Sequence, residues 1–186
     1  ESLNWMMCAL SKSSQIVAKT LSLFETSIEQ TVIADVLKMA AVDVQTALNE
    51  LQLIGLTKST GTSFTIKYPA VRARLYADLP KRRRIRLHSA AFEILERQRC
   101  CPEVLSHHSF EGGRFEEAAA LCLQLATENF KHQNYKAAVR FYERADKCAK
   151  LCRTEFNPTD EIRLATCYRW IGNRVRSIRR FDHLLS

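Results

Sequence analysis

Five cations stand within the ten residues 79–88, which read LPKRRRIRLH. Lys and Arg bind carboxylates and phosphates, and Arg does so with a planar fork of donors. Such a run fits a grip on nucleic acid, a targeting signal, or the solvated face of a helix. A helical period points Arg83 and Arg86 outward. The apolar stripe of the same helix, expected to face inward, is Ile85, His88, Phe92 and Leu95.

Three interpretations of the run stay open. In the plainest one, the Arg stems cover apolar surface and their heads stay in water. In the second, Arg72, Arg83 and Arg86 contact an acidic partner or an adjacent domain of the same chain. In the third, which is the least favoured, the run binds nucleic acid. Cations at the start of a helix interact unfavourably with the helix dipole, so we expect an acidic neighbour to pair with them. The local candidates are Asp78, Glu93 and Glu96. A nuclear import signal fits poorly, because the run lies inside an amphipathic helical pattern.

The other reactive residue types predict no catalytic or metal site. Cys100-Cys101 and His107-His108 match no common zinc spacing, and Pro102 interrupts any shared helix face; His107 is interpreted as a helix-packing residue. No phosphate-binding G-x-x-x-x-G-K-[ST] motif and no serine nucleophile elbow occur. We therefore expect this chain to be no enzyme and to hold no cofactor, metal or small-molecule substrate.

Composition indicates a packed, mostly helical protein. The chain has 186 residues, a hydrophobic fraction of 46%, only five Gly and four Pro, and a formal net charge of +8. Its seven Cys include no C-x-x-C pair, which favours reduced thiols in a cytoplasmic protein. No apolar run reaches the ~20 residues that a membrane helix needs. The chain begins at Glu1, and we expect it to be part of a longer protein.

Residues 1–70 are predicted to form a winged-helix domain. Three helical patterns cover 10–26, 27–39 and 43–55, and Asp43 can cap the third. Residues 56–68 then read as a β-hairpin: a Ser-Thr-Gly turn precedes the alternation of Phe64, Ile66 and Tyr68.

The third helix would be the one that reads DNA in such a domain. It offers no Lys or Arg, whereas DNA readers need cations for phosphates and usually Arg for guanine edges. We therefore expect no specific DNA binding. The side chains expected to be exposed are Asp43, Gln45, Thr46, Asn49, Glu50 and Gln52.

A connecting helix pair is predicted over 71–100, and tetratricopeptide-like helical repeats over 101–186. Three segments, FEEAAALCLQLA, YKAAVRFYERA and RVRSIRRFDHLL, repeat a small residue near the helix start: Ala118, Ala138 and Ser177. Large apolar groups follow one turn later, at Phe141, Tyr142 and Phe181. The residues expected to pack the repeats are Tyr135, Phe141 and Tyr142, with Cys122, Cys148 and Cys167 in the core and Trp170 against Tyr168 or Phe181.

The segment FTIKYPAVRARLYADLPKRRRIRLHSAAFEILE, residues 64–96, resembles a known arrangement. It is similar to the join between a winged helix and a helical-repeat region in STAND-type signalling ATPases. These include MalT-like bacterial regulators and ATPase regions fused to cyclases or kinases. The matching residues are Phe64, Ile66, Val71, Arg72, Tyr76, Leu79, Pro80, Arg83, Leu87 and His88. Tyr68 stands where the family has a His that helps to sense bound nucleotide.

The resemblance implies a mostly α fragment: a winged helix with a small β-hairpin, followed by a tetratricopeptide-like array. It implies a non-catalytic regulatory fragment that relays partner binding to an upstream nucleotide-binding domain, where ATP and Mg²⁺ would bind. The partner would be a protein or the upstream domain itself, and no membrane is implied. The alternatives are a winged-helix transcriptional regulator that binds DNA and an independent helical-repeat scaffold with no ATPase parent.

Overall fold

The computed structural model describes the backbone of residues 2–185 and the side chains of residues 5–184. The chain divides into two compact units, residues 1–98 and 99–186. The expected mostly α fold, with a small hairpin followed by a helical array, is confirmed.

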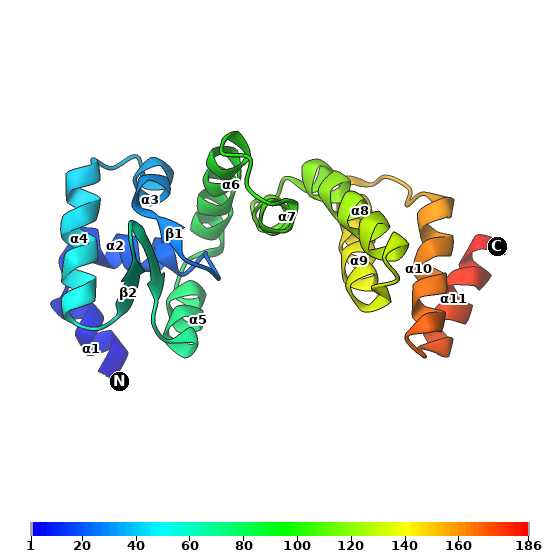
Figure 1. Ribbon diagram of the computed structural model, residues 1–186, viewed down its shortest axis with the longest axis horizontal. Helices are drawn as coiled ribbons and strands as arrows, with labels where there is room; N and C mark the ends of the chain where they lie inside the picture. Colours follow the sequence, from blue (N-terminus) through cyan, green and yellow to red (C-terminus); the bar gives the residue numbers. More distant parts are fainter. Residues whose placement is uncertain (1, 186) are drawn as a thin grey trace. The chain divides into compact units, whose positions relative to one another are not determined.

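The first unit packs helices around one apolar core and a small antiparallel sheet (Figure 1). Its elements are α1 (Ser2–Ala9), α2 (Lys12–Leu21), β1 (Ile28–Glu29), α3 (Gln30–Leu37), α4 (Ala41–Leu53), β2 (Thr57–Thr60), β3 (Ser63–Ile66), α5 (Pro69–Ala77) and α6 (Lys81–Arg97). The predicted hairpin is β2–β3, in which Thr57 pairs with Ile66. Phe64 and Ile66 point into the core, as the alternation predicts.

Two details of this unit differ from the prediction. The sheet has a third strand, because β1 pairs with the free edge of β3 through Ile28 and Phe64. A strand of two residues is too short for alternation to reveal it. The cap prediction for Asp43 is wrong: α4 begins at Ala41 and its cap residue is Ala40, so Asp43 lies inside the first turn.

Helix α6 carries the cation run in its first turns. Its buried side is Leu87, His88, Ala91, Phe92 and Leu95. Ile85 was expected on this side but is 37% exposed, because residue 85 falls at the edge of the stripe that the other five define.

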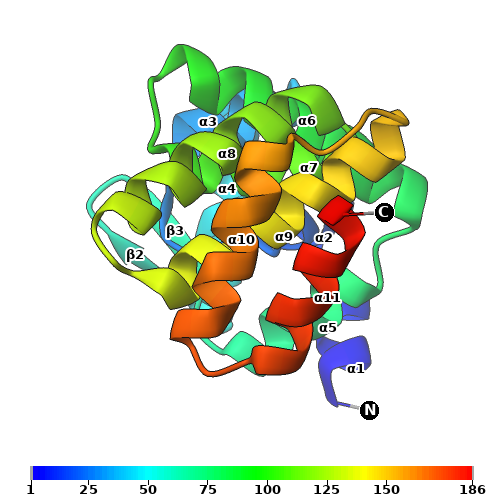
Figure 2. The same ribbon diagram turned by 90° about the vertical axis from the view of Figure 1, so that its right-hand side faces the viewer.

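The second unit is a series of packed helices, α7 (Pro102–Glu111), α8 (Phe115–Lys131), α9 (Tyr135–Cys152), α10 (Pro158–Trp170) and α11 (Arg174–Leu185). Helix α8 packs against α7 and α9, and α10 packs against α9 and α11. Figure 2 shows α10 and α11 side by side. The second apolar core lies mainly between α8, α9 and α10.

Small residues let these helices approach closely, as the sequence predicts. Ala118, Ala138 and Ser177 are all buried, and so are Cys122, Cys148 and Cys167. Tyr135, Phe141 and Tyr142 belong to the core or pack on it. Two aromatic predictions are wrong: Trp170 stacks on Tyr135, with ring centroids 5.6 Å apart, and Phe181 is 37% exposed.

Ala138→Trp should lower the free energy of unfolding of the chain by about 1–3 kcal/mol, because Ala138 is fully buried in the helix seam and a larger side chain overpacks it. Lys136→Trp, two residues earlier on the exposed side of α9, is the matched control and should change little. Urea unfolding followed by circular dichroism measures both. Equal unfolding midpoints would contradict this assignment of the helix faces.

Candidate functional site

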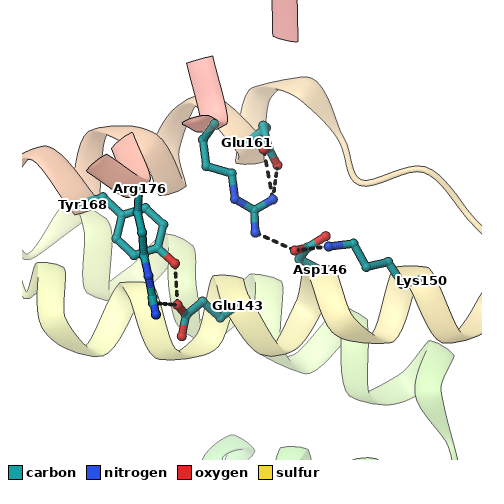
Figure 3. A network of polar contacts seen from close by, with 7 residues as sticks. Glu143, Asp146, Lys150, Glu161, Tyr168 and Arg176 are labelled. Atoms are coloured by element: carbon teal, nitrogen blue, oxygen red, sulfur yellow. Dashed lines mark hydrogen bonds and ion pairs between the residues drawn. The ribbon is translucent and has the colours of Figure 1, made fainter. Parts of the chain in front are cut away.

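An open groove of about 930 Å³ lies on the second unit and is lined by residues of α9, α10 and α11. Charged side chains from all three helices meet there (Figure 3). On α9, Glu143, Asp146 and Lys150 follow one another at steps of three and four, so they share one face. Arg176 and Arg180 of α11, which are four residues apart, form ion pairs with Glu143 and Asp146.

The first group of contacts, named the Arg180 cluster, consists of Arg180, Asp146, Glu161 and Lys150. Arg180 donates to Asp146 Oδ2 at 2.6 Å and to both oxygens of Glu161 at 3.0 and 3.1 Å. Lys150 donates to the same Asp146 oxygen at 2.9 Å. Both acids are buried, whereas Lys150 reaches into solvent. Arg180 therefore ties α11 to α9 and to α10 at once.

Within this cluster, ion pairing has a larger effect on the pKa values than burial has. Burial disfavours the charged form of Asp146, but hydrogen bonds from Arg180 and Lys150 outweigh it and lower the pKa of Asp146. Burial likewise opposes the charge on Arg180, and the bonds to Asp146 and Glu161 raise the pKa of Arg180. Asp146 and Arg180 are thus both held in their charged forms at neutral pH.

The second group, named the Arg176 cluster, consists of Arg176, Glu143 and Tyr168. Arg176 donates to Glu143 Oε1 at 2.8 Å, and the Tyr168 hydroxyl donates to the same oxygen. Burial, followed by the bond to Glu143, raises the pKa of Tyr168 to about 12. Tyr168 is therefore a hydrogen-bond donor at neutral pH and no general base.

The buried thiols near this region are also unsuited to nucleophilic chemistry. Burial raises the pKa of Cys148 to about 12 and that of Cys167 to about 11. A thiol in this range stays protonated and inert. Within residues 2–185, no group of three or more His, Cys, Asp or Glu side chains could hold a metal ion. The groove thus offers paired charges and an apolar wall.

Arg72, Arg83 and Arg86 belong to the first unit, whereas the groove belongs to the second. Arg83 and Arg86 are exposed on α6, whose first turn carries no acidic residue and whose cap residue, Pro80, provides no side-chain cap. Arg72, on α5, forms a 3.7 Å ion pair with Glu25. Asp78 was a candidate ion-pair partner for the cation run, but it pairs with Arg74 at 3.2 Å.

One cation of the run has a partner inside its own unit. Arg84 lies over the ring of Tyr76, 5.1 Å from its centroid. In the part of the chain that the structure describes, Arg83 and Arg86 form no ion pair. Both are therefore available to an acidic surface outside the unit.

Helix α4 presents a mixed exposed face rather than a cationic one. Asp43, Thr46, Asn49 and Gln52 are exposed as expected, whereas Gln45 and Glu50 are half-buried. Glu50 accepts hydrogen bonds from the backbone and hydroxyl of Ser11, at 3.1 and 2.8 Å, and from the Ser14 hydroxyl. Unexpected apolar residues, Val42 and Leu53, are 72% and 88% exposed on the same helix.

The chain should bind duplex DNA weakly and without sequence preference. Its net charge of +8 supports salt-sensitive contacts, but α4 has no Lys or Arg to read a base edge. Binding to random and selected duplexes at near-physiological salt measures this. A site preferred by ~10³-fold or more would contradict it.

Comparison with known proteins gives a fold relationship. No family model and no curated protein matches the sequence. The structure is similar to the crystal structure of a STAND protein with a tetratricopeptide repeat sensor from Pyrococcus horikoshii, with a TM-score of 0.60 and 16% identity. The similarity covers 96% of this chain and 26% of that one. It shows a shared fold.

In the described part of the chain, no helix combines the length and apolar character needed to cross a membrane.

The Arg180 and Arg176 clusters were missed by sequence reasoning. One signal was present, since Arg176 and Arg180 flank the buried Ser177 at helical spacing. Charged residues beside an inward-facing small residue indicate ion pairs at a helix interface.

Proposed function

We propose that this chain is the non-catalytic regulatory and protein-interaction part of a larger STAND-type signalling ATPase. The observation that carries the proposal is the fold similarity to the STAND protein with a repeat sensor, which spans 96% of this chain and so includes both units. The order of elements supports it, because α2, α3 and α4 are followed by the β2–β3 hairpin and then by a helical array, as the sequence resemblance implies.

In this proposal the two units have different tasks. The second unit, a tetratricopeptide-like sensor, binds a protein partner. The first unit, acting as a winged helix, passes the bound state to a nucleotide-binding domain upstream. Its contact with that domain uses Arg83 and Arg86 of α6, together with Arg72 of α5.

ATP and Mg²⁺ would bind to the upstream domain and not to this chain. The sequence has no glycine-rich loop to cradle phosphates, and the unpaired Arg83 and Arg86 project from the exposed side of a helix. The residues present do not fit a nucleotide, so no step of hydrolysis is assigned to them. The proposal also places the protein in the cytoplasm, which the seven free thiols support.

Arg83→Glu combined with Arg86→Glu should leave the isolated chain folded but disrupt regulation of the full-length protein. Both side chains are exposed, and acidic groups near a helix start favour the helix dipole, so the melting temperature should stay within about 3 °C. In the full-length protein the reversed charges should change regulated ATP hydrolysis by about tenfold, a typical coupling between sites.

Lys12→Glu with Lys58→Glu is the matched control, since both lysines are exposed on the same unit and the charge change is equal. It should leave regulated hydrolysis unchanged. If the full-length protein with the Arg83 and Arg86 changes keeps its regulated hydrolysis, the result would favour the plainer interpretation, in which the arginines form a solvated face. A marked loss of stability in the isolated chain would defeat both interpretations.

A further inference from the structure

Helix α11 is held to its unit by its polar side. Ser177 is its buried residue among the described side chains, and the Ser177 hydroxyl donates to the Ala165 carbonyl of α10 at 2.9 Å. Arg176 and Arg180, on either side of Ser177, make the ion pairs to α9 and α10. No residue of α11 belongs to the apolar core of the second unit, as far as the described residues define it.

Three apolar side chains of α11 are exposed. Val175, Ile178 and Phe181 are 61%, 59% and 37% exposed, and they follow one another at steps of three. Residues three and four apart on a helix are surface neighbours, so these side chains form one stripe, named the α11 stripe. This is the reverse of an ordinary surface helix, whose apolar side faces its core. A contiguous apolar stripe left in solvent marks an interaction surface.

Two cations flank the α11 stripe. Arg174 is four residues from Ile178, and Arg179 is four residues from Val175, so each cation lies beside an apolar member. Both are exposed, and neither forms an ion pair within residues 2–185. Asp182, one turn beyond Ile178, is the acid on this side and is also exposed. The flanks of the stripe are therefore mainly positive.

We propose that the α11 stripe is the docking surface for an amphipathic helix of a partner protein, with Asp or Glu side chains on both sides of its apolar stripe. This deepens the proposed function and rests on it, because it names the class of partner that the repeat unit binds. A helix fits because apolar ridges spaced by three and four residues pack into the matching grooves of another helix. Flanking carboxylates fit because they would pair with Arg174 and Arg179.

A second copy of this chain fits the stripe less well. Symmetric pairing of two α11 stripes brings arginines of one copy near those of the other, and like charges across an interface oppose association. The same cations would meet carboxylates on an acidic helix. Charge complementarity therefore selects the acidic partner over self-association.

The test uses two synthetic peptide helices of ~20 residues with the same leucine stripe at steps of three and four. One carries Glu on both flanks of the stripe and the other carries Lys. Fluorescence anisotropy at near-physiological salt should show that the Glu peptide binds this chain at least about tenfold more tightly than the Lys peptide.

Variants locate the binding on the stripe. Val175→Ser with Ile178→Ser should weaken the Glu peptide about tenfold while leaving the fold intact, since both residues are exposed. Arg174→Glu with Arg179→Glu should reverse the preference between the peptides. Lys131→Glu with Lys136→Glu, an equal charge change on exposed residues of the same unit, should leave the preference in place.

Equal affinity for the two peptides, or binding insensitive to Val175 and Ile178, would overturn the proposal. So would a concentration-dependent dimer in sedimentation that Ile178→Ser abolishes, because it would make a second copy the occupant. Binding to vesicles of anionic phosphatidylserine that depends on Ile178, without peptide binding, would assign the stripe to a membrane surface. If the peptide binds to the α11 stripe but does not change ATP hydrolysis in the full-length protein, the docking proposal would stand and only the proposed relay function would be contradicted.

Discussion

Arg180→Ala should lower the free energy of unfolding of the helical-repeat unit by about 3–5 kcal/mol, the usual cost of leaving a buried charge without its partner. Arg180 is the shared partner of Asp146 and Glu161, whose side chains are only 8% and 5% exposed. Its removal leaves Glu161 without this cation and Asp146 with only the solvated Lys150. Denaturant unfolding of the isolated chain measures the loss.

Arg176→Ala is the matched control on the same helix. Its pair with Glu143 is far more exposed, at 59% and 39%, so the loss should stay below about 1 kcal/mol. Adding Glu161→Gln to Arg180→Ala should recover part of the larger loss, because it removes one stranded carboxylate. Similar losses for Arg176→Ala and Arg180→Ala would show that solvent screens both clusters alike.

Acidification from pH 7 to pH 5 should destabilise the second unit through His108. Burial, followed by the charge of neighbouring His107, lowers the pKa of His108 from 6.5 to about 3. The unfolded chain takes up a proton near pH 6.5, whereas folded His108 stays neutral down to about pH 3. Stability is therefore full above pH 6.5 and falls as pH decreases, by about 2 kcal/mol at pH 5 from this group.

The slope of unfolding free energy against pH measures how many protons are taken up on unfolding. Between pH 6.5 and 5, His108→Gln should reduce this number by close to one. Measuring the slope in both proteins isolates His108 from the other histidines. Below about pH 4 a further loss should follow, because the unfolded chain protonates Asp146 near its ordinary pKa of 3.8, whereas Arg180 and Lys150 lower the pKa of the folded carboxyl. Parallel slopes for the two proteins above pH 5 would contradict the His108 assignment.

Periodicity predicted the elements well where one side of a helix is apolar. Ala138 and Ser177 were assigned to close helix contacts from the repeated pattern, and both are buried. The hairpin was readable because Phe64 and Ile66 alternate with polar residues. These predictions need only the chain's local period, which a single sequence contains.

Residues whose environment depends on tertiary contact were not predictable. No local pattern distinguishes Asp146 and Glu161 from other acidic residues, and only the approach of α11 makes them a buried pair around Arg180. Phe181 follows Ser177 by one turn, as Phe141 and Tyr142 follow Ala138, but on α11 the inward positions belong to Arg180 and Ser177. The strand β1 exists only because the edge of β3 is there to pair with it.

The relay proposal is tested most directly by ATP hydrolysis in the full-length protein, measured with and without residues 99–186. The two units are separately compact, so the deletion ends between them. If the repeats transmit a bound state to an upstream nucleotide-binding domain, the two proteins should hydrolyse Mg-ATP at rates that differ by about tenfold or more, within the usual range of coupling between sites. Equal rates would contradict the relay, and no hydrolysis by either protein would contradict a STAND-type parent.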